Sequence, residues 1–414
     1  APGLPLLTMR IVHWYPNFLA GGGVANSVLG LADAQAAAGA DVWIASLAHD
    51  DPLYGALRPA GGVQVATWGT GHALRWSGLQ LHGLTPGSAR ELRALQPDVV
   101  HAHAEFNPDN WWAPRVWACP LVLSPHGAFH STVMHRGARA KRLYVRAARR
   151  LLYRDLRRVH VLSPAEEADV HATLPAAQTY RVPQGPSPAV QRALRGLESS
   201  TETDGAAAHV EFMFLGRVDV EVKGLDLLVE AFARAVRQRA ASRPARLTIA
   251  GPSWRGGAAT LRELAVRLGV DELVDIRGSV AADEVPPLLR TCDVYVQLSR
   301  NESSPLSLND ALAFGKPAII SDRIGTISSE EIADLPHVKV VSPSIADAAR
   351  AIGEALDDLD GLRRAAREAR EIVRELLSWE RAAERHLEVY RSLGEPQPSP
   401  DETELGSSHP ERSR

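Results

Sequence analysis

Short apolar runs alternate with helical patterns along most of this chain. Apolar residues at helical spacing between about Val24 and Ala38 predict a helix that stops at Gly39. Runs typical of strands occur at 10–15, 41–46, 63–67, 99–102, 121–124 and 159–162, and again at 212–215, 247–250, 274–277, 294–298 and 318–321. Strands separated by helices in this way form parallel sheets with helices on both faces. The pattern therefore predicts an α/β protein with two doubly wound domains.

A stretch without periodicity separates the two series of strands. Residues 193–209 are mostly small and polar, which is typical of a linker. We therefore expect one Rossmann-like domain at 9–192 and another at 210–376, facing each other with the ligand between the carboxyl ends of the two sheets. A last helix is expected at 377–393. The tail at 394–414 is rich in Pro, Ser and Glu and is expected to be disordered.

The composition narrows the classes of protein. Of the 414 residues, 45% are hydrophobic and 23% are charged, as in ordinary globular proteins. The net charge of −3 argues against a nucleic-acid partner, because no basic excess is available to neutralise phosphates. The two cysteines, Cys119 and Cys292, make neither a disulfide framework nor a zinc spacing, which indicates a reducing compartment. Residues 1–8 lack the features of a signal peptide, and no apolar run reaches about 18 residues, so we expect a cytoplasmic protein.

The segment 300–321 carries the most informative pattern. Glu302 and Asp310 lie eight positions apart, across a predicted loop and the first turns of a helix. The N-terminus of such a helix has unpaired N–H groups and a positive dipole end, beside a loop that carries a carboxylate. This arrangement suits a ligand with both phosphate and sugar hydroxyls. Pro305 has no N–H to donate, so phosphate contacts would come from Leu306 and the amides after it.

The same segment resembles the carboxylate motif of glycosyltransferase family 4, whose members are retaining enzymes of the GT-B fold. Further stretches between Met9 and Leu393 resemble this family too, so the resemblance covers nearly the whole chain. Residues 216–228, which begin Gly-Arg and contain Lys-Gly, resemble the basic pair at the start of the family's second domain. The resemblance implies a nucleotide-sugar donor bound between two facing domains, with the helix at 377–393 packing back on the first domain.

The resemblance also implies roles for single residues. Arg217 and Lys223 would bind the donor pyrophosphate and assist catalysis, since both are cations that supply charge-assisted hydrogen bonds. Glu302 would bond the hydroxyls of the transferred sugar, and Asp310 would hold the ribose. The family has Glu in place of Asp310 and a glycine-rich triplet in place of residues 303–305, so the implied ribose contact uses a shorter side chain here. Solvated surface cations are the alternative for Arg217 and Lys223.

Two loops of the first half complete the implied donor site. Gly21-Gly-Gly23 fits neither a dinucleotide fingerprint nor a P-loop, and resembles the family loop whose backbone approaches the leaving phosphate, here through Gly22 and Gly23. A flexible turn is the alternative. His126, in Ser-Pro-His-Gly, matches the family histidine near the reacting carbon, where a neutral imidazole accepts from a sugar hydroxyl or stabilises positive charge. We place the nucleotide base near Arg277.

Several other side chains are candidates for the acceptor site or for a metal site. Asn17, His103 and Trp111 are candidate acceptor contacts, although tryptophans are more often buried in a core. His101 and His103 share one face of a predicted strand, a spacing that two metal ligands can have. No acid or cysteine lies at a suitable distance in the sequence, so we expect no metal and no cofactor.

The segment Arg136–Arg158 is strongly basic. It contains ten Lys or Arg residues and one acid, Asp155. Its apolar residues, among them Tyr144 and Ala148, lie on one face of the predicted helix. A basic amphipathic helix can lie on an anionic membrane surface. Packing of the same face on its own domain is the alternative, and the sequence leaves both open.

These observations predict a retaining, metal-independent glycosyltransferase that takes a sugar from a nucleotide-sugar donor. The stretch 124–166 resembles enzymes that build bacterial surface polysaccharides, which favours a glycan or lipid-linked acceptor and a place at the inner membrane face. A soluble small-molecule acceptor is the alternative, as is a sugar-nucleotide-binding protein or epimerase without transfer activity. The base, the sugar and the acceptor leave little trace in the sequence, and UDP-linked donors are preferred on family frequency.

Overall fold

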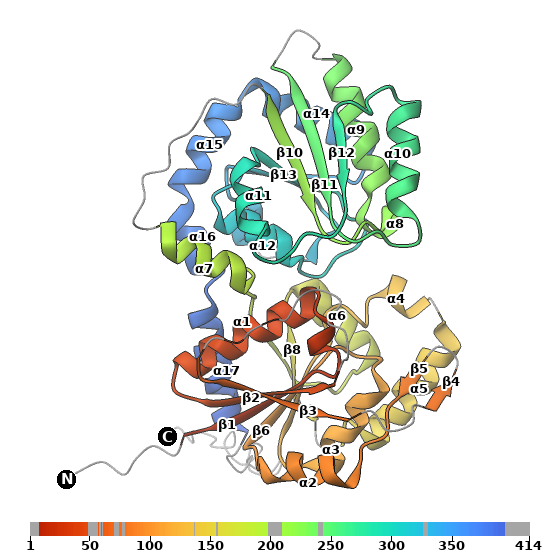
Figure 1. Cartoon of the computed structure of the whole chain (residues 1–414), viewed down its shortest axis with the longest axis vertical. Coiled ribbons are helices and arrows are strands. Elements are labelled where there is room, and N and C mark those ends of the chain that lie inside the picture. The colour runs from red at the N-terminus through yellow and green to blue at the C-terminus, as the bar shows by residue number, and fades with distance from the viewer. Residues whose placement is uncertain are drawn as a thin grey trace, which may run out of the picture.

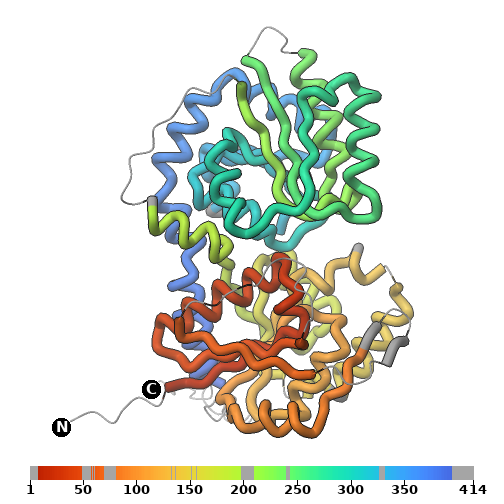
Figure 2. Tube along the Cα trace, viewed as in Figure 1, coloured from red at the N-terminus to blue at the C-terminus, as the bar shows by residue number. Residues whose placement is uncertain are grey.

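Two α/β domains stacked end to end make up the computed structural model of this chain, with the first domain below the second in Figure 1. The structure describes residues 8–48, 57, 59, 61–69, 74–76, 79–135, 137–154, 156–197, 209–238, 243–325 and 330–393. The trace in Figure 2 passes from the first domain to the second and returns to the first at its C-terminal end. Each domain has its own parallel sheet and its own buried core.

The first domain is built on a seven-stranded sheet of order β3-β2-β1-β6-β7-β8-β9, with all strands parallel. Its strands are β1 (Arg10–Trp14), β2 (Asp41–Leu47), β3 (Val63–Trp68), β6 (Val99–His103), β7 (Leu121–Ser124), β8 (Leu156–Val161) and β9 (Thr179–Arg181). Its helices are η1 (Phe18–Ala20), α1 (Gly23–Ala37), α2 (Pro86–Ala94), η2 (Pro108–Trp112), α3 (Ala113–Val116), α4 (Ser131–His135), α5 (Ala138–Leu151) and α6 (Pro164–Thr173). A short antiparallel hairpin, β4 (Leu74–Trp76) and β5 (Leu79–Leu81), lies outside the sheet.

The second domain has a six-stranded parallel sheet of order β12-β11-β10-β13-β14-β15. Its strands are β10 (Val210–Leu215), β11 (Ala245–Ala250), β12 (Val274–Arg277), β13 (Val294–Gln297), β14 (Ala318–Ser321) and β15 (Val338–Val341). The remaining helices of the chain are α7 (Pro188–Leu197), α8 (Val220–Lys223), α9 (Leu225–Gln238), α10 (Gly257–Arg267), α11 (Val285–Thr291), α12 (Leu306–Ala313), α13 (Glu330–Ala333), α14 (Ile345–Asp357), α15 (Leu359–Glu368), α16 (Arg370–Leu376) and α17 (Trp379–Ser392). Among the described helices, none is both long and apolar enough to cross a membrane.

The prediction of two facing doubly wound domains is confirmed, and each strand predicted from an apolar run is present. The central strands are buried along their whole length, as β13 shows, because helices cover both faces of the sheet. Sequence reasoning missed β9 and β15, which lie at the edges of their sheets. In β15 only Val338 is buried, so the apolar signal of an interior strand is absent.

The expected boundary between the domains is wrong. Residues 188–197 form α7, which the sequence analysis divided between the first domain and the linker. Val190 in α7 is fully buried in a cluster with second-domain residues such as Leu289 and Tyr295. The chain therefore enters the second domain before α7, because the apolar face of this helix packs there. Residues 198–208 of the expected linker, and the tail at 394–414, lie outside the described residues.

The strand order identifies where a ligand can bind. In the first sheet β1 lies between β2 and β6, and in the second β10 lies between β11 and β13, so the chain direction across each sheet reverses at these strands. Loops at such a point leave the sheet on opposite faces and open a crevice at the carboxyl ends of the strands. The two crevices face each other across the domain junction.

Candidate active site

A cavity of about 620 Å³ lies between the two domains, at the carboxyl ends of both sheets. Loops after β1, β7 and β8 line it from the first domain, and loops after β10, β11 and β13 line it from the second. The lining residues include 21–24, 126, 162, 184, 187, 189, 215–217, 223, 250–252, 302–307 and 310. Gly22, Gly23 and Leu306, which the sequence assigned to the donor site, are among them.

Lys223 and Glu302 form an ion pair in the wall of this cavity. Their side chains are only 14% and 20% exposed. Gly224 permits this approach, since its φ is +62° and a Cβ at this position would collide with the carbonyl oxygen of Leu298. The glycine therefore ends α8 tightly against the end of β13 and brings the lysine to the loop that carries Glu302. Two residues that the sequence assigned separately act as one charged unit.

Arg217 supplies a second cation to the cavity. Its guanidinium lies over the ring of Trp254, 4.9 Å from the centroid, and 4.0 Å from the carboxylate of Asp219. Stacking on an aromatic ring holds the planar guanidinium and leaves its N–H groups free to point outward in the plane. Sequence reasoning missed Trp254, because it lies on the loop after β11 and nothing in its local sequence links it to Arg217.

Gln184 connects the two domains at the edge of the cavity. Its amide nitrogen donates to the carbonyl oxygen and the hydroxyl of Ser304, at 2.8 and 3.0 Å. Its side-chain oxygen accepts from Ser27 on α1 at 2.7 Å, and its backbone oxygen accepts from the amide of Asn309 at 2.9 Å. These bonds hold the N-terminus of α12 against the first domain. Sequence reasoning missed this residue too, because its partners lie far along the chain.

Asp310 lines the cavity from α12 but is only 5% exposed. Its carboxylate accepts a hydrogen bond from the backbone N–H of Ser187 at 2.5 Å. Burial raises the pKa of the Asp310 carboxyl from 3.8 to about 7, and the bond from Ser187 offsets only part of this effect. The ribose contact implied by the resemblance stays a prediction, and this carboxyl changes charge near neutral pH.

His126 lines the cavity from the loop after β7. It has a left-handed φ of +52°, which the surrounding contacts stabilise. The carboxylate of Glu166 accepts from the backbone N–H groups of Gly127 and Leu162, at 2.6 and 2.8 Å, and so fixes the shape of this loop. At Gly127 a Cβ would lie 2.7 Å from the hydroxyl oxygen of Ser303, so the loops of the two domains touch beside the histidine.

Four predicted site residues do not line the cavity. Arg277 lies at the end of β12, half exposed, and its guanidinium donates to Asp275 at 2.7 Å. Val280 and Val285, on the segment that follows β12, line the cavity instead. The nucleotide-base contact predicted for Arg277 stays a prediction.

The three predicted acceptor contacts also lie elsewhere. Asn17 is exposed where η1 begins. Trp111 packs against the core of the first domain, with its ring centroid 5.4 Å from that of Tyr144. This is the core position that the sequence analysis gave as commoner for tryptophans. His103 is 2% exposed and bonds to His13 and His126 beneath the cavity wall. Local sequence gave no means of telling a wall residue from one in the layer beneath it.

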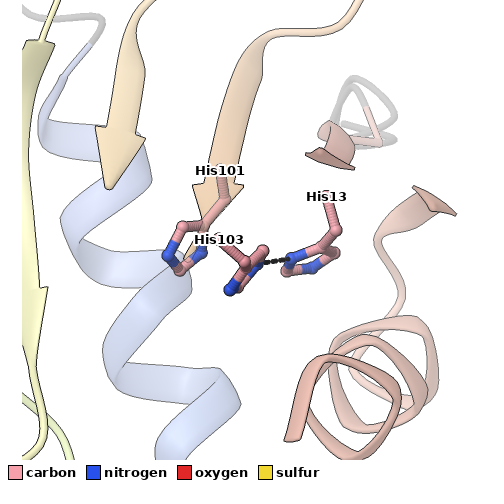
Figure 3. Close-up of side chains that lie close together, drawn as sticks. All are labelled: His13, His101 and His103. Carbon is pink, nitrogen blue, oxygen red and sulfur yellow. Dashed lines mark hydrogen bonds between the residues drawn. The ribbon is translucent and has the colours of Figure 1, made fainter. Parts of the chain in front are cut away.

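His13, His101 and His103 have ring nitrogens within 4.8 Å of one another and form the strongest metal candidate among the described residues. Figure 3 shows them on neighbouring strands, with a hydrogen bond between His13 and His103. Each of the six ring nitrogens has a hydrogen-bond partner within the protein. The three histidines are therefore part of a hydrogen-bonded row, and the expectation that no metal binds here stays a prediction.

The basic segment forms α5, and its apolar face packs on its own domain. Tyr144, Val145 and Ala148 are buried in the core of the first domain. The opposite face carries arginines, and its exposed large apolar side chain is Leu143. The sequence left two interpretations of this helix open, and the apolar face follows the second of them: it packs on the helix's own domain. Arg136 and Asp155 lie outside the described residues.

Comparisons with known proteins fit this architecture. Residues 21–188 match the family described as "Glycosyltransferase Family 4", and residues 209–358 match "Glycosyl transferases group 1". A D-inositol 3-phosphate glycosyltransferase of Nocardia farcinica is 28% identical over 308 residues, which cover 71% of this chain and 66% of the relative. Each matched segment corresponds to one of the two domains described above.

Solved structures share the fold. The sucrose-phosphate synthase of Thermosynechococcus elongatus has a TM-score of 0.69 and 20% identity, over 93% of this chain and 99% of that one. The Anabaena protein Alr3699/HepE, solved in complex with UDP and glucose, has a TM-score of 0.66 and 16% identity, over 93% of this chain and 100% of that one.

Two facing Rossmann-like domains with a cavity between them, together with the family matches, define a glycosyltransferase of the GT-B fold. Within that class, the chain belongs to glycosyltransferase family 4.

Proposed function

We propose that this enzyme is a retaining, metal-independent glycosyltransferase that moves a sugar from UDP to a hydroxyl of a small phosphorylated polyol or sugar. The observation that carries the proposal is the Lys223–Glu302 pair beside the N-terminus of α12, with Arg217 in the lining of the same cavity. Two cations and a helix dipole can neutralise a departing diphosphate without a metal ion. Among the described residues, the carboxylates that line the cavity are Glu302 and Asp310.

Both carboxylates are engaged in ways that support retention without a carboxylate nucleophile. Glu302 is paired with Lys223, and Asp310 accepts from the backbone N–H of Ser187. In the proposed reaction the departing phosphate oxygen accepts the proton of the acceptor hydroxyl on the same face of the sugar. Glu302 bonds the sugar hydroxyls, while Arg217 and Lys223 stabilise the negative charge that develops on the diphosphate.

The donor and acceptor classes come from the similar proteins. The Anabaena structure holds UDP and glucose, and the names of the Nocardia and Thermosynechococcus proteins refer to phosphorylated small molecules. These names favour the small-molecule acceptor that the sequence analysis kept as an alternative. One observation supports a lipid-linked acceptor, namely the exposed arginine face of α5.

A donor and acceptor screen tests the proposal. A UDP-sugar should raise the melting temperature more than GDP- or ADP-sugars do. At a hundred times its Kd, it should add about 2.7 kcal/mol to the free energy of unfolding. Inositol phosphates and hexose phosphates should then accept the sugar equally well with and without EDTA, with the anomeric configuration retained. Loss of activity in EDTA would contradict the metal independence, and an inverted product would contradict retention. Turnover only with acceptors on anionic vesicles would contradict the small-molecule acceptor.

Asp310 gives the donor affinity an expected dependence on pH. Its pKa of about 7, raised by burial, means that the carboxyl is protonated below neutral pH and ionised above it. If the ionised form accepts from the ribose hydroxyls, the affinity for UDP-glucose should fall about tenfold per pH unit below 7. Calorimetric titration between pH 5.5 and 8 measures this, since UDP-glucose has no group of its own that titrates there. Asp310→Asn should bind more weakly and lose the slope, and an unchanged slope would refute the ribose contact.

The same shift has a defined effect on folding. Between the unfolded pKa of 3.8 and the folded pKa of about 7, the native state keeps a proton on Asp310 that the unfolded chain releases. The contribution of this residue to stability therefore becomes less favourable as the pH rises through that window. Donor binding recovers part of this loss, because the ribose hydroxyls bond to the charged form.

A further inference from the structure

A row of buried polar side chains runs through the first domain and ends at His126 in the cavity. Its members, in order, are His160, Ser124, His101, Tyr390, Gln35, His13, His103 and His126. All members before His126 are at most 6% exposed. They come from β8, β7, β6 and β1 and from the helices α1 and α17. Of these members only His126 lines the cavity, and the proposed reaction gives the others no role, so they require an explanation.

Neighbouring members of the row are hydrogen-bonded without a break. The bonds measure 2.7 Å between Ser124 and His160, 2.6 Å between His101 and Ser124, 2.6 Å between Tyr390 and His101, 3.5 Å between Gln35 and Tyr390, 2.7 Å between His13 and Gln35, 2.9 Å between His103 and His13, and 3.1 Å between His126 and His103. Part of this row, around His13 and His103, is drawn in Figure 3.

One end of the row fixes the direction of the first bonds. Nε2 of His160 lies 2.9 Å from the carbonyl oxygen of Val182, which can only accept, so this nitrogen carries a proton. Burial lowers the pKa of His160 to about 4, so the ring is neutral at pH 7 and its Nδ1 has a lone pair. Ser124 therefore donates its one hydroxyl proton to Nδ1 of His160. The Ser124 oxygen then accepts from Nε2 of His101.

The same reasoning carries the direction as far as Gln35. His101 is neutral, since burial lowers its pKa well below the usual value, and its Nδ1 accepts the hydroxyl proton of Tyr390. The Tyr390 oxygen then accepts from the amide nitrogen of Gln35 at 3.5 Å, and Nδ1 of His386 lies 3.4 Å from the same oxygen as a side branch of the row. The side-chain oxygen of Gln35 is left as the acceptor for Nε2 of His13.

The last three rings follow in the same orientation. Burial lowers the pKa of His13 to about 4 and that of His126 to about 3, and lowers the pKa of His103 well below its usual value. Each ring is therefore neutral and carries one proton. His13 carries its proton on Nε2 and donates it to the side-chain oxygen of Gln35, so its Nδ1 accepts from Nε2 of His103. Nδ1 of His103 in turn accepts from Nε2 of His126.

We propose that this row fixes the proton of His126 on Nε2 and presents its Nδ1 to the cavity as a hydrogen-bond acceptor. Within the described part of the chain, Nδ1 of His126 has no protein partner. An acceptor at this point fits a sugar hydroxyl and repels a phosphate oxygen. Gln35 and Tyr390 are then positioning residues for His126, and α17 supports the active site from behind. The row ends at a carbonyl group, so it orients the histidine and offers no exit for a proton.

The tautomer can be measured on the free protein. In long-range ¹⁵N–¹H spectra of protein labelled at the histidine nitrogens, the five rings of the row should all show the Nε2–H form at pH 7. The signals are assigned by replacing one histidine at a time. An Nδ1–H form at His126, His103 or His13, or a charged ring among them, would overturn the proposal.

A pair of tyrosine variants separates positioning from packing. Tyr390→Phe breaks the row and allows the Gln35 amide to turn over, so His13, His103 and His126 should become mixtures of both tautomers. Tyr144→Phe removes the hydroxyl of another buried tyrosine of the first domain, which donates to the carbonyl oxygen of Asn107 at 3.1 Å and lies outside the row. It should leave the His126 spectrum unchanged. Equal effects of both variants on that spectrum would refute the row. If Tyr390→Phe does not fold, Gln35→Met breaks the row at the next member.

The activity of the same variants connects the tautomer to transfer. Tyr390→Phe should lower kcat on the order of ten- to a hundredfold with a smaller change in KM, because the acceptor at His126 is then only partly available. Tyr144→Phe should stay within about twofold of the unmodified enzyme. The contact with a sugar hydroxyl rests on the proposed function, whereas the tautomer does not. Normal kcat in Tyr390→Phe with mixed tautomers would refute the role of Nδ1, and an absence of transfer in every form would count against the proposed function alone.

Discussion

Replacing Glu302 by glutamine should lower kcat by about a hundred- to a thousandfold, with a much smaller effect on folding. The substitution keeps the shape of the side chain and removes the charge that pairs with Lys223 in the cavity wall. A carboxylate has two oxygens that can each accept from a sugar hydroxyl. An amide has only one such oxygen, and its NH₂ group donates where the second hydroxyl also donates. Initial rates with saturating donor, measured beside a thermal unfolding curve of the same preparation, give both quantities.

Two further variants make this result interpretable. Glu354 lies on α14, outside the cavity lining; its carboxylate is 48% exposed and 3.7 Å from the Lys339 ammonium on β15. Glu354→Gln should leave the rate unchanged. Lys223→Met should also lower kcat strongly. Because the two partners act as one unit, the double variant should lose far less than the product of the single losses. Near-normal turnover in Glu302→Gln, with folding intact, would refute the assignment of the site.

The sequence was most informative where function depends on neighbours along the chain. The spacing from Glu302 to the helix that follows it, and the stretch that holds Arg217 and Lys223, are local features, so the carboxylate loop and the basic pair could be assigned from the sequence. Central strands such as β13 are apolar on both faces and were predicted for the same reason. The two facing sheets follow from the alternation of such strands with helices.

The parts that could not be predicted depend on partners far apart in the sequence. Gln184 joins Ser27 to Ser304, and Trp254 stacks on Arg217, yet neither has a distinctive local sequence. His103 was predicted to face the acceptor and lies one layer beneath His126 instead. Periodicity tells which residues are buried, and it cannot tell which buried residues bond to one another.

The row of histidines follows the same rule. The pair His101 and His103 on one strand could be read from the sequence, and a metal site was the only function that such spacing alone suggests. Their actual partners are Tyr390 on the last helix and His13 on the first strand. His13 lies near the start of the chain and Tyr390 near its end, so the folded structure was needed to show that they belong to one hydrogen-bonded row.

The return of the chain to the first domain depends on one tryptophan. Trp379, the first residue of α17, is 3% exposed and donates from its ring nitrogen to the carbonyl oxygen of Pro186 at 2.6 Å. Gly30 on α1 and Gly185 form the slot around it, since a Cβ at either position would lie 2.5 Å from the indole ring. The slot joins α1, the crossing between the domains and α17. The helix that carries Tyr390 is therefore anchored at its N-terminal end by this ring.

Trp379→Ala should therefore lower the free energy of unfolding by about 3–5 kcal/mol, because it removes a large buried ring and leaves a cavity between two glycines. This corresponds to a fall in melting temperature of roughly 6–20 °C, which calorimetry measures directly. Trp254→Ala is the matched control, since that ring is 43% exposed and its loss should change stability by no more than about 0.5 kcal/mol. Gly30→Ala should destabilise the protein by collision with the same ring, and should cost much less when Trp379 is already alanine. A melting temperature for Trp379→Ala close to that of Trp254→Ala would show that α17 is held by its other contacts.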